Sequence, residues 1–111
     1  MKIQEEEKGN FAVISLGGKI MGGSDATMFH GKVHECLDSG KKKIIVDLTN
    51  VEWMNSSGLG MLTAALTTIK KSQGELIITG TTANIQNLLN ITQLVRIFHV
   101  HDTVEDALRS N

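Results

Sequence analysis

The sequence predicts a single α/β domain with a mixed β-sheet and the element order β-β-α-β-α-β-α-β-α. Short β-branched runs alternate with helical patterns, which is typical of parallel strands joined by helical crossovers. A Gly9-Asn10 turn separates the first two predicted strands and indicates an antiparallel hairpin. The length of 111 residues suits one domain, so we expect the domain to span residues 1–111.

The first half of the chain is predicted to hold the hairpin, a loop and a helix. Residues 3–7 and 11–16 have strand patterns, and the second is apolar on both faces, which places it inside the sheet. The glycine-rich residues 17–23 are predicted to form a loop. A helix follows over residues 25–39 with Ser24 as its N-cap. Its expected inner face consists of Met28, Val33 and Leu37.

The second half alternates between strands and helices. The continuous apolar run at 43–48 indicates a parallel strand that is covered on both faces. A connection over residues 49–55 contains Trp53, which we expect to pack over the core, with an interface role as the alternative. Ser56 or Ser57 begins the next helix. The remaining predicted elements are a strand at 75–80, a helix capped by Thr81 or Thr82, a strand at 96–100 and a helix at 104–109.

Composition excludes several classes of function. The chain has 11 Lys and Arg against 12 Asp and Glu, so it lacks the basic character of a direct nucleic-acid binder. Its apolar runs are too short for a membrane helix. Cys36 is the only cysteine, which excludes an internal disulfide and suits a cytoplasmic protein; we expect it to be a small buried hydrophobe. We expect no cofactor and no metal, because His30 and His34 alone are a weak pair of ligands.

The most informative segment runs from residue 55 to residue 60 and reads NSSGLG. Two serines stand at a helix start, and Gly58 and Gly60 follow within one turn. Each glycine costs a helix about 1 kcal/mol relative to alanine, so close approach of another molecule is a natural explanation. A phosphate on Ser56 would lie at a helix N-terminus, where free N–H groups and the dipole stabilise an anion. The segment therefore favours a phosphorylation switch.

This segment closely resembles the signature of STAS-domain anti-sigma factor antagonists, which reads DS[ST]GLG. The resemblance extends over nearly the whole chain, through the leading hairpin, the Gly18-Lys19-Ile20 turn, the buried strand and the later helices. It implies a STAS fold and identifies Ser56 as the phosphate acceptor. The neighbours of this switch site are Asn55, Ser57, Gly58 and Gly60.

The resemblance also implies the partners. In the family, the unphosphorylated form binds an anti-sigma factor that is also a serine kinase, and sigma factor is released. Phosphorylation stops this binding, and a PP2C-type phosphatase reverses it. We expect the partner to contact an apolar surface beside Ser56, although Leu59 could instead turn into the core. The expected contact residues are Met21, Gly22, Met54, Leu59 and Met61.

Two positions depart from the family pattern, and two other functions compete with the switch. Asn55 stands where the family usually has aspartate, and Met21 stands where the turn often has aspartate. One competing function is an unphosphorylated STAS subunit of a transporter or signalling complex. The other is a small hydrolase or phosphocarrier that uses Ser56 with a histidine. No base adjoins Ser56 and no GxSxG elbow occurs, so we expect no enzymatic activity.

Overall fold

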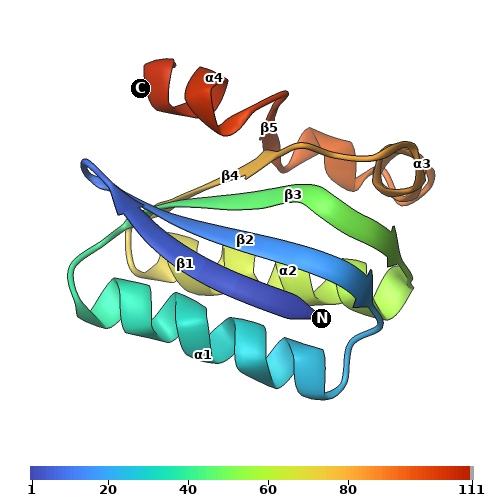
Figure 1. The fold of residues 1–111 in the computed structure, drawn as a ribbon, viewed down its shortest axis with the longest axis horizontal. Helices are drawn as coiled ribbons and strands as arrows, with labels where there is room; N and C mark the ends of the chain where they lie inside the picture. Colours follow the sequence, from blue (N-terminus) through green and yellow to red (C-terminus); the bar gives the residue numbers. More distant parts are fainter. Residues whose placement is uncertain (111) are drawn as a thin grey trace.

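A five-stranded sheet forms the centre of the protein in the computed structural model, which describes residues 1–110. The strands lie in the order β1-β2-β3-β4-β5 (Figure 1). β1 is antiparallel to β2, and all other neighbours are parallel, so the predicted mixed sheet is confirmed. The strands are β1 (Lys2–Lys8), β2 (Phe11–Ile20), β3 (Lys43–Met54), β4 (Glu75–Thr79) and β5 (His99–His101).

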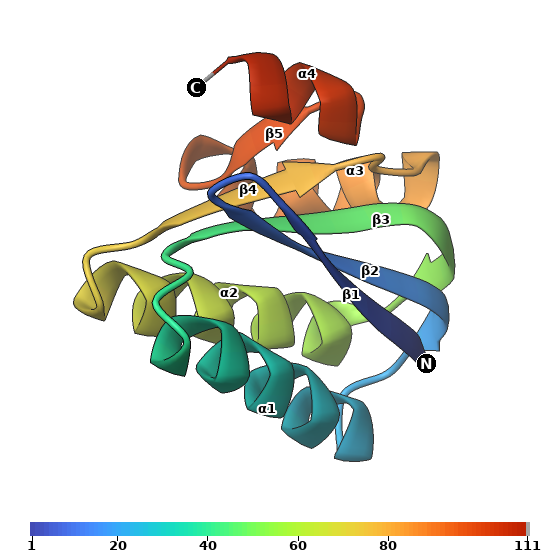
Figure 2. The ribbon, with the colours of Figure 1, turned by 60° about the vertical axis from the view of Figure 1, so that its left-hand side comes forward.

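Helices cover both faces of this sheet. α1 and α2 run side by side along one face, while α4 lies on the opposite face (Figures 1 and 2). The order of strands and α-helices is the predicted one, with a 3₁₀ helix inserted before β5. The helices are α1 (Ser24–Asp38), α2 (Ser56–Lys71), α3 (Ala83–Ile91), the 3₁₀ helix η1 (Leu94–Arg96) and α4 (Val104–Arg109). Among residues 1–110, no helix combines the length and hydropathy that crossing a membrane requires.

β2 and β3 are longer than the sequence predicted. The expected loop at 17–23 and connection at 49–55 are mostly strand, and the β2–β3 pairing continues as far as Ile20 and Met54. Two register shifts interrupt the pairing, one of them beside Gly18, which has a φ of +81°. Glycines and polar residues at these bulges obscured the period-2 pattern on which the prediction rested. The extension carries the end of β3 directly to the start of α2.

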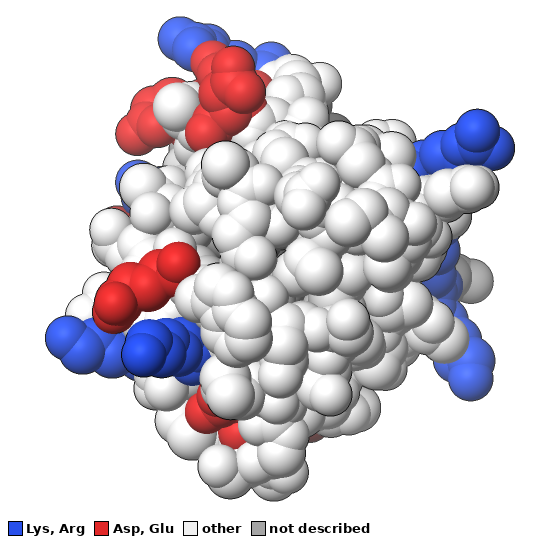
Figure 3. All heavy atoms as spheres, turned by 90° about the vertical axis from the view of Figure 1, so that its right-hand side faces the viewer, with Lys and Arg blue, Asp and Glu red and all other residues white. Residues whose placement is uncertain are grey.

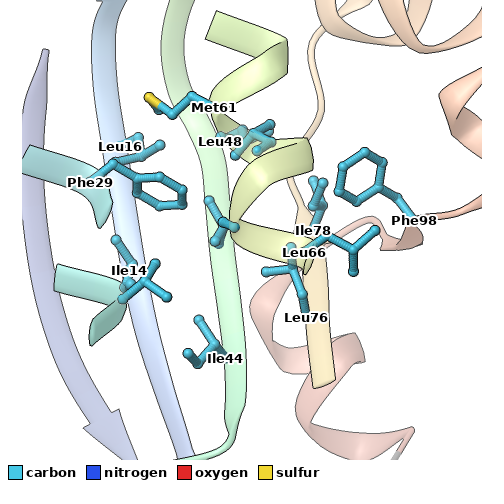
Figure 4. Close-up of a cluster of buried hydrophobic side chains, with 14 of the residues drawn as sticks. Ile14, Leu16, Phe29, Ile44, Leu48, Met61, Leu66, Leu76, Ile78 and Phe98 are labelled. Atoms are coloured by element: carbon cyan, nitrogen blue, oxygen red, sulfur yellow. The ribbon is translucent and has the colours of Figure 1, made fainter. Parts of the chain in front are cut away.

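Two hydrophobic clusters lie on opposite faces of the sheet. The larger one joins β2, β3 and β4 to α1, α2 and α3 (Figure 4). The smaller one lies under α4 and consists of Phe11, Val13, Ile45, Ile77 and Ala107. In α1 the buried side chains are Phe29, Val33 and Cys36. Val33 is buried as predicted, and Leu37 is partly buried against the core. Met28, which was also expected to face inward, is 47% exposed, so the prediction is wrong for this residue.

The Cys36 thiol is fully buried, which confirms the prediction for this residue. Burial, assisted by the nearby negative charge of Glu5, raises the pKa of Cys36 to about 12. Because only the thiolate is a good nucleophile, the native protein should react very slowly with a disulfide reagent at pH 8. In urea the thiol should react at the rate of a free cysteine. Rapid labelling of the native protein would show that α1 does not bury this side chain.

Candidate functional site

The candidate site lies where β2 and β3 end and α2 begins, at the right-hand end of the molecule in Figure 1. Ile20 and Met54 form the last pair of the two strands. The backbone N–H of Asn55 then donates to the carbonyl of Ile20 over 3.3 Å. Ser56 is the first residue of α2, as the sequence predicted for one of the two serines. The sheet therefore fixes the point at which the helix starts.

Asn55 is the N-cap of α2, a role that the sequence analysis did not assign to it. Its backbone is extended, and its Oδ1 accepts a hydrogen bond of 2.8 Å from the N–H of Gly58. A side-chain oxygen in this position satisfies one of the unpaired N–H groups in the first turn. Because asparagine provides the cap, neither serine hydroxyl is needed for it. Ser56 and Ser57 are both exposed.

The two glycines of the first turn have different roles. A Cβ on Gly58 would lie 2.6 Å from the carbonyl oxygen of Ile20 and 2.8 Å from Cγ of Met54. Gly58 therefore allows α2 to approach the strand ends of its own chain, and the expected approach of another molecule is wrong for this residue. A Cβ on Gly60 would meet nothing within 4 Å. Gly60 is exposed, so its surface is open to a partner.

The loop between β2 and α1 contacts the second serine. Gly22 has a φ of +86°, and a Cβ on it would lie only 2.9 Å from Cβ of Ser57. The N–H of Met21 donates to Oδ2 of Asp25 over 3.4 Å, which ties the loop to the first turn of α1. Gly22 thus lies against Cβ of Ser57, and both its backbone angle and this contact require glycine.

Three of the residues expected on the partner surface are buried. Met54, Leu59 and Met61 are 0%, 2% and 3% exposed, respectively. Met54 ends β3 with its side chain in the main core, and Leu59 and Met61 belong to the face of α2 that packs on the sheet. The apolar surface predicted from these three residues is therefore wrong. Leu59 turns into the core, which was the alternative that the sequence left open for this residue.

Two other apolar side chains are exposed at this end of the sheet. Met21, which follows β2, is 52% exposed, and Trp53 in β3 is 42% exposed. Trp53 precedes the buried Met54, and successive side chains in a strand point to opposite faces. The expected packing of Trp53 over the core is therefore wrong, and the alternation of Trp53 with Met54 was the signal that could have corrected it. Figure 3 shows that the centre of this face carries no Lys, Arg, Asp or Glu side chain.

The electrostatics of the site favour an added anion. The first turn of α2 contains no acidic residue, while Lys70 and Lys71 lie in its last turn. The positive end of the helix dipole is therefore not neutralised by a carboxylate of its own helix. A phosphate on Ser56 would meet favourable backbone N–H groups and the dipole.

One histidine lies beside a serine. Nε2 of His101 lies 3.3 Å from Oγ of Ser110, so the only serine that the described hydrogen bonds place beside a histidine is far from Ser56 in the sequence. Within residues 1–110, no three His, Cys, Asp or Glu side chains are grouped closely enough to hold a metal ion.

Comparison with known proteins shows which family the sequence of this chain matches. The family model described as "STAS domain" matches residues 2–107. A candidate anti-sigma factor antagonist of Thermotoga maritima is 30% identical over 97 residues, which is 86% of this chain and 86% of that protein. This relative shares sequence along almost the entire domain.

Solved structures share the fold. The crystal structure of a candidate anti-sigma factor antagonist from Thermotoga maritima superposes with a TM-score of 0.87 at 23% identity, covering 97% of this chain and 92% of that one. The Bacillus cell fate determinant SpoIIAA in its phosphorylated form superposes with a TM-score of 0.75 at 19% identity, covering 98% of both chains. At these identities the superpositions establish the similarity of fold.

The burial of Met61 predicts a large loss of stability in Met61→Asp. An unpaired carboxylate in the core should lower the free energy of unfolding by more than about 3 kcal/mol. Ala64→Asp is the matched control, because Ala64 is exposed on the same helix, and it should lower stability by less than about 1 kcal/mol. Urea unfolding followed by circular dichroism measures both. Equal stability of the two variants would place Met61 on the surface.

The two glycines of α2 should respond in opposite directions to alanine. Gly58→Ala should destabilise the protein by about 1–3 kcal/mol, because its Cβ overlaps the carbonyl of Ile20. Gly60→Ala should stabilise it by up to about 1 kcal/mol, because alanine is the better helix former and the space is empty. Thermal unfolding of both variants tests this contrast. A stabilising Gly58→Ala would refute the close approach of α2 to β2.

Proposed function

Because this chain belongs to the STAS-domain family, we propose that it is an anti-sigma factor antagonist in which the hydroxyl of Ser56 is the phosphorylation switch. The name of its Thermotoga relative supports the first part of this proposal. The description of SpoIIAA in a phosphorylated form supports the second. In this proposal the STAS domain spans the whole chain, residues 1–111.

The observation that carries the proposal is the exposed Ser56 at the first position of a helix whose cap is already provided by Asn55. A kinase can reach this hydroxyl without breaking the capping bond between Asn55 and Gly58. The added phosphate lies near the positive end of the dipole, which favours an exposed anion by about 0.3–1 kcal/mol. The fold should therefore tolerate the modification.

The same phosphate opposes binding of the partner. It adds a charge of about −1.5 to −2 at pH 7 to the end of the molecule whose centre is uncharged (Figure 3). In the unphosphorylated state Met21 and Trp53 are exposed at this end of the sheet, and the backbone at Gly60 is open. An anti-sigma factor that docks here buries Ser56. Phosphorylation then forces it to desolvate a dianion, and the complex dissociates.

Ser56 is the better acceptor of the two serines. Cβ of Ser57 lies against Gly22, so the β2–α1 loop limits the approach of a kinase to Ser57. The contact between Gly22 and Ser57 also places the loop next to the phosphorylated residue. Met21 and Gly22 therefore remain partner contacts in the proposal, while Met54, Leu59 and Met61 support the surface from within the core.

The partners in the proposal are proteins that act on or through this face. An anti-sigma factor with serine kinase activity binds the unphosphorylated form, transfers phosphate to Ser56 and releases sigma factor while it is bound. A PP2C-type phosphatase restores the hydroxyl. In this cycle the chain is a binding protein and not an enzyme, and it works in the cytoplasm without contacting nucleic acid.

The acceptor can be identified by mass spectrometry. The purified chain is incubated with ATP and each serine-kinase anti-sigma factor encoded in the same genome. With its cognate kinase, the native protein should gain one phosphate, and Ser56→Ala should gain none. Ser57→Ala is the matched control and should be labelled to nearly the native extent.

Two results would contradict the proposal. Labelling that persists in Ser56→Ala and is lost in Ser57→Ala would make Ser57 the acceptor. Tight binding of an anti-sigma factor or another partner without any labelling would instead favour an unphosphorylated STAS subunit of a signalling complex. In that case the exposed Met21 and Trp53 would still serve as contacts.

A further inference from the structure

The last part of β3 has a neighbouring strand on one side only. Among the described residues, β4 pairs with β3 as far as Asp47 and Thr79, whereas β2 continues alongside it to Met54. The backbone groups of residues 48–54 that point away from β2 therefore have no strand to bond to. Such an open edge is prone to fraying unless another element covers it.

The side chain of Asn84 covers this edge at Met54. Asn84 lies in the first turn of α3, two residues after the capping residue Thr82. Its Oδ1 accepts a hydrogen bond of 2.9 Å from the backbone N–H of Met54, across 30 positions of sequence. Both residues are at least partly buried. An amide oxygen from a helix thus takes the place of a carbonyl from a missing strand.

The backbone N–H groups of Met54 and Asn55 form hydrogen bonds on opposite sides of the strand end. The N–H of Asn55 donates to the carbonyl of Ile20 on the β2 side, while the N–H of Met54 donates to Asn84 on the opposite side. Successive N–H groups of a strand alternate in this way. Asn55 then accepts from Gly58 in α2. The two residues before Ser56 are therefore held from β2, α2 and α3.

We propose that Asn84 is a positioning residue for the phosphorylation of Ser56, a role that rests on the proposed function. Asn84 acts through Met54 and Asn55: it fixes the end of β3, and the end of β3 fixes the cap and the first turn of α2. Without its amide oxygen, the N–H of Met54 has only water to bond to. Ser56 then samples a wider range of positions, which slows transfer of phosphate to its hydroxyl.

Amide exchange measured by NMR on the protein alone tests the structural half of this inference. In Asn84→Ala, exchange at Met54 should accelerate about tenfold, as expected for the loss of one hydrogen bond. Exchange at Gly58 and Leu59, whose N–H groups donate to Asn55, should also accelerate, while Ile44 and Ile78 in the core strands should keep their native rates. Asn87→Ala, the same change at an exposed position one turn along α3, should alter none of these rates.

Asn84→Asp separates positioning from a general loss of stability. A carboxylate keeps an acceptor oxygen and lies favourably in the first turn of α3. Exchange at Met54 should therefore return to within about twofold of the native rate, since the bond is restored. The inference would be overturned if Asn84→Asp kept the native melting temperature but did not restore slow amide exchange at Met54.

The labelling rate tests the functional half. With the kinase that labels the native chain, Asn84→Ala should lower kcat for phosphorylation of Ser56 about tenfold, with little change in KM, because the docking surface is intact. Asn87→Ala should be labelled at the native rate. Unchanged exchange at Met54, or unchanged kcat, would overturn the role of Asn84. If no kinase labels the native chain, the proposed function fails, and the exchange rates still decide whether Asn84 holds the end of β3.

Discussion

The hydrogen bond from the N–H of Gly58 to Oδ1 of Asn55 is the interaction on which the rest of the site depends. It ends the strand, begins the helix and leaves Ser56 as the first helical residue. It also explains why glycine is needed at 58, since the cap brings the first turn of α2 against the carbonyl of Ile20. A serine cap would have occupied the hydroxyl that the proposed switch requires to be accessible. Asparagine caps the helix without a charge, so a phosphate on Ser56 adds to a first turn that contains no acidic residue.

Burial and exposure alternate over a short stretch around this bond. Met54 is buried and Trp53 is exposed on β3, and Leu59 is buried while Ser56 is exposed on α2. The buried side chains fix the strand and the helix in the core, and the exposed ones form the face that is free for a partner. One segment therefore serves both stability and recognition. A substitution in this segment changes binding without changing the stability of the fold only when the replaced side chain is exposed.

The sequence predicted the fold well because the fold depends on patterns that are local. The apolar run at 43–48 indicated a buried strand, and the serines at 56 and 57 indicated the start of the next helix; the structure contains both in the predicted order. The site was harder to predict, because it depends on contacts between distant residues. The bond between Met54 and Asn84 spans 30 positions, and the contact between Gly22 and Ser57 joins the β2–α1 loop to the first turn of α2. The sequence pattern of α2 also could not show that Met61 faces the sheet, since the helix is apolar over a wide arc.

In the proposed switch, phosphate on Ser56 abolishes partner binding and leaves the fold intact. The most direct measurement is a calorimetric titration of the cognate anti-sigma factor with the native protein and with the chain phosphorylated at residue 56, together with the melting temperature of each form. We expect tight binding of the native protein, a loss of at least about tenfold in affinity for the phosphoprotein, and melting temperatures within a few degrees of each other. Equal affinity of the two forms, or a phosphoprotein that is largely unfolded, would contradict it.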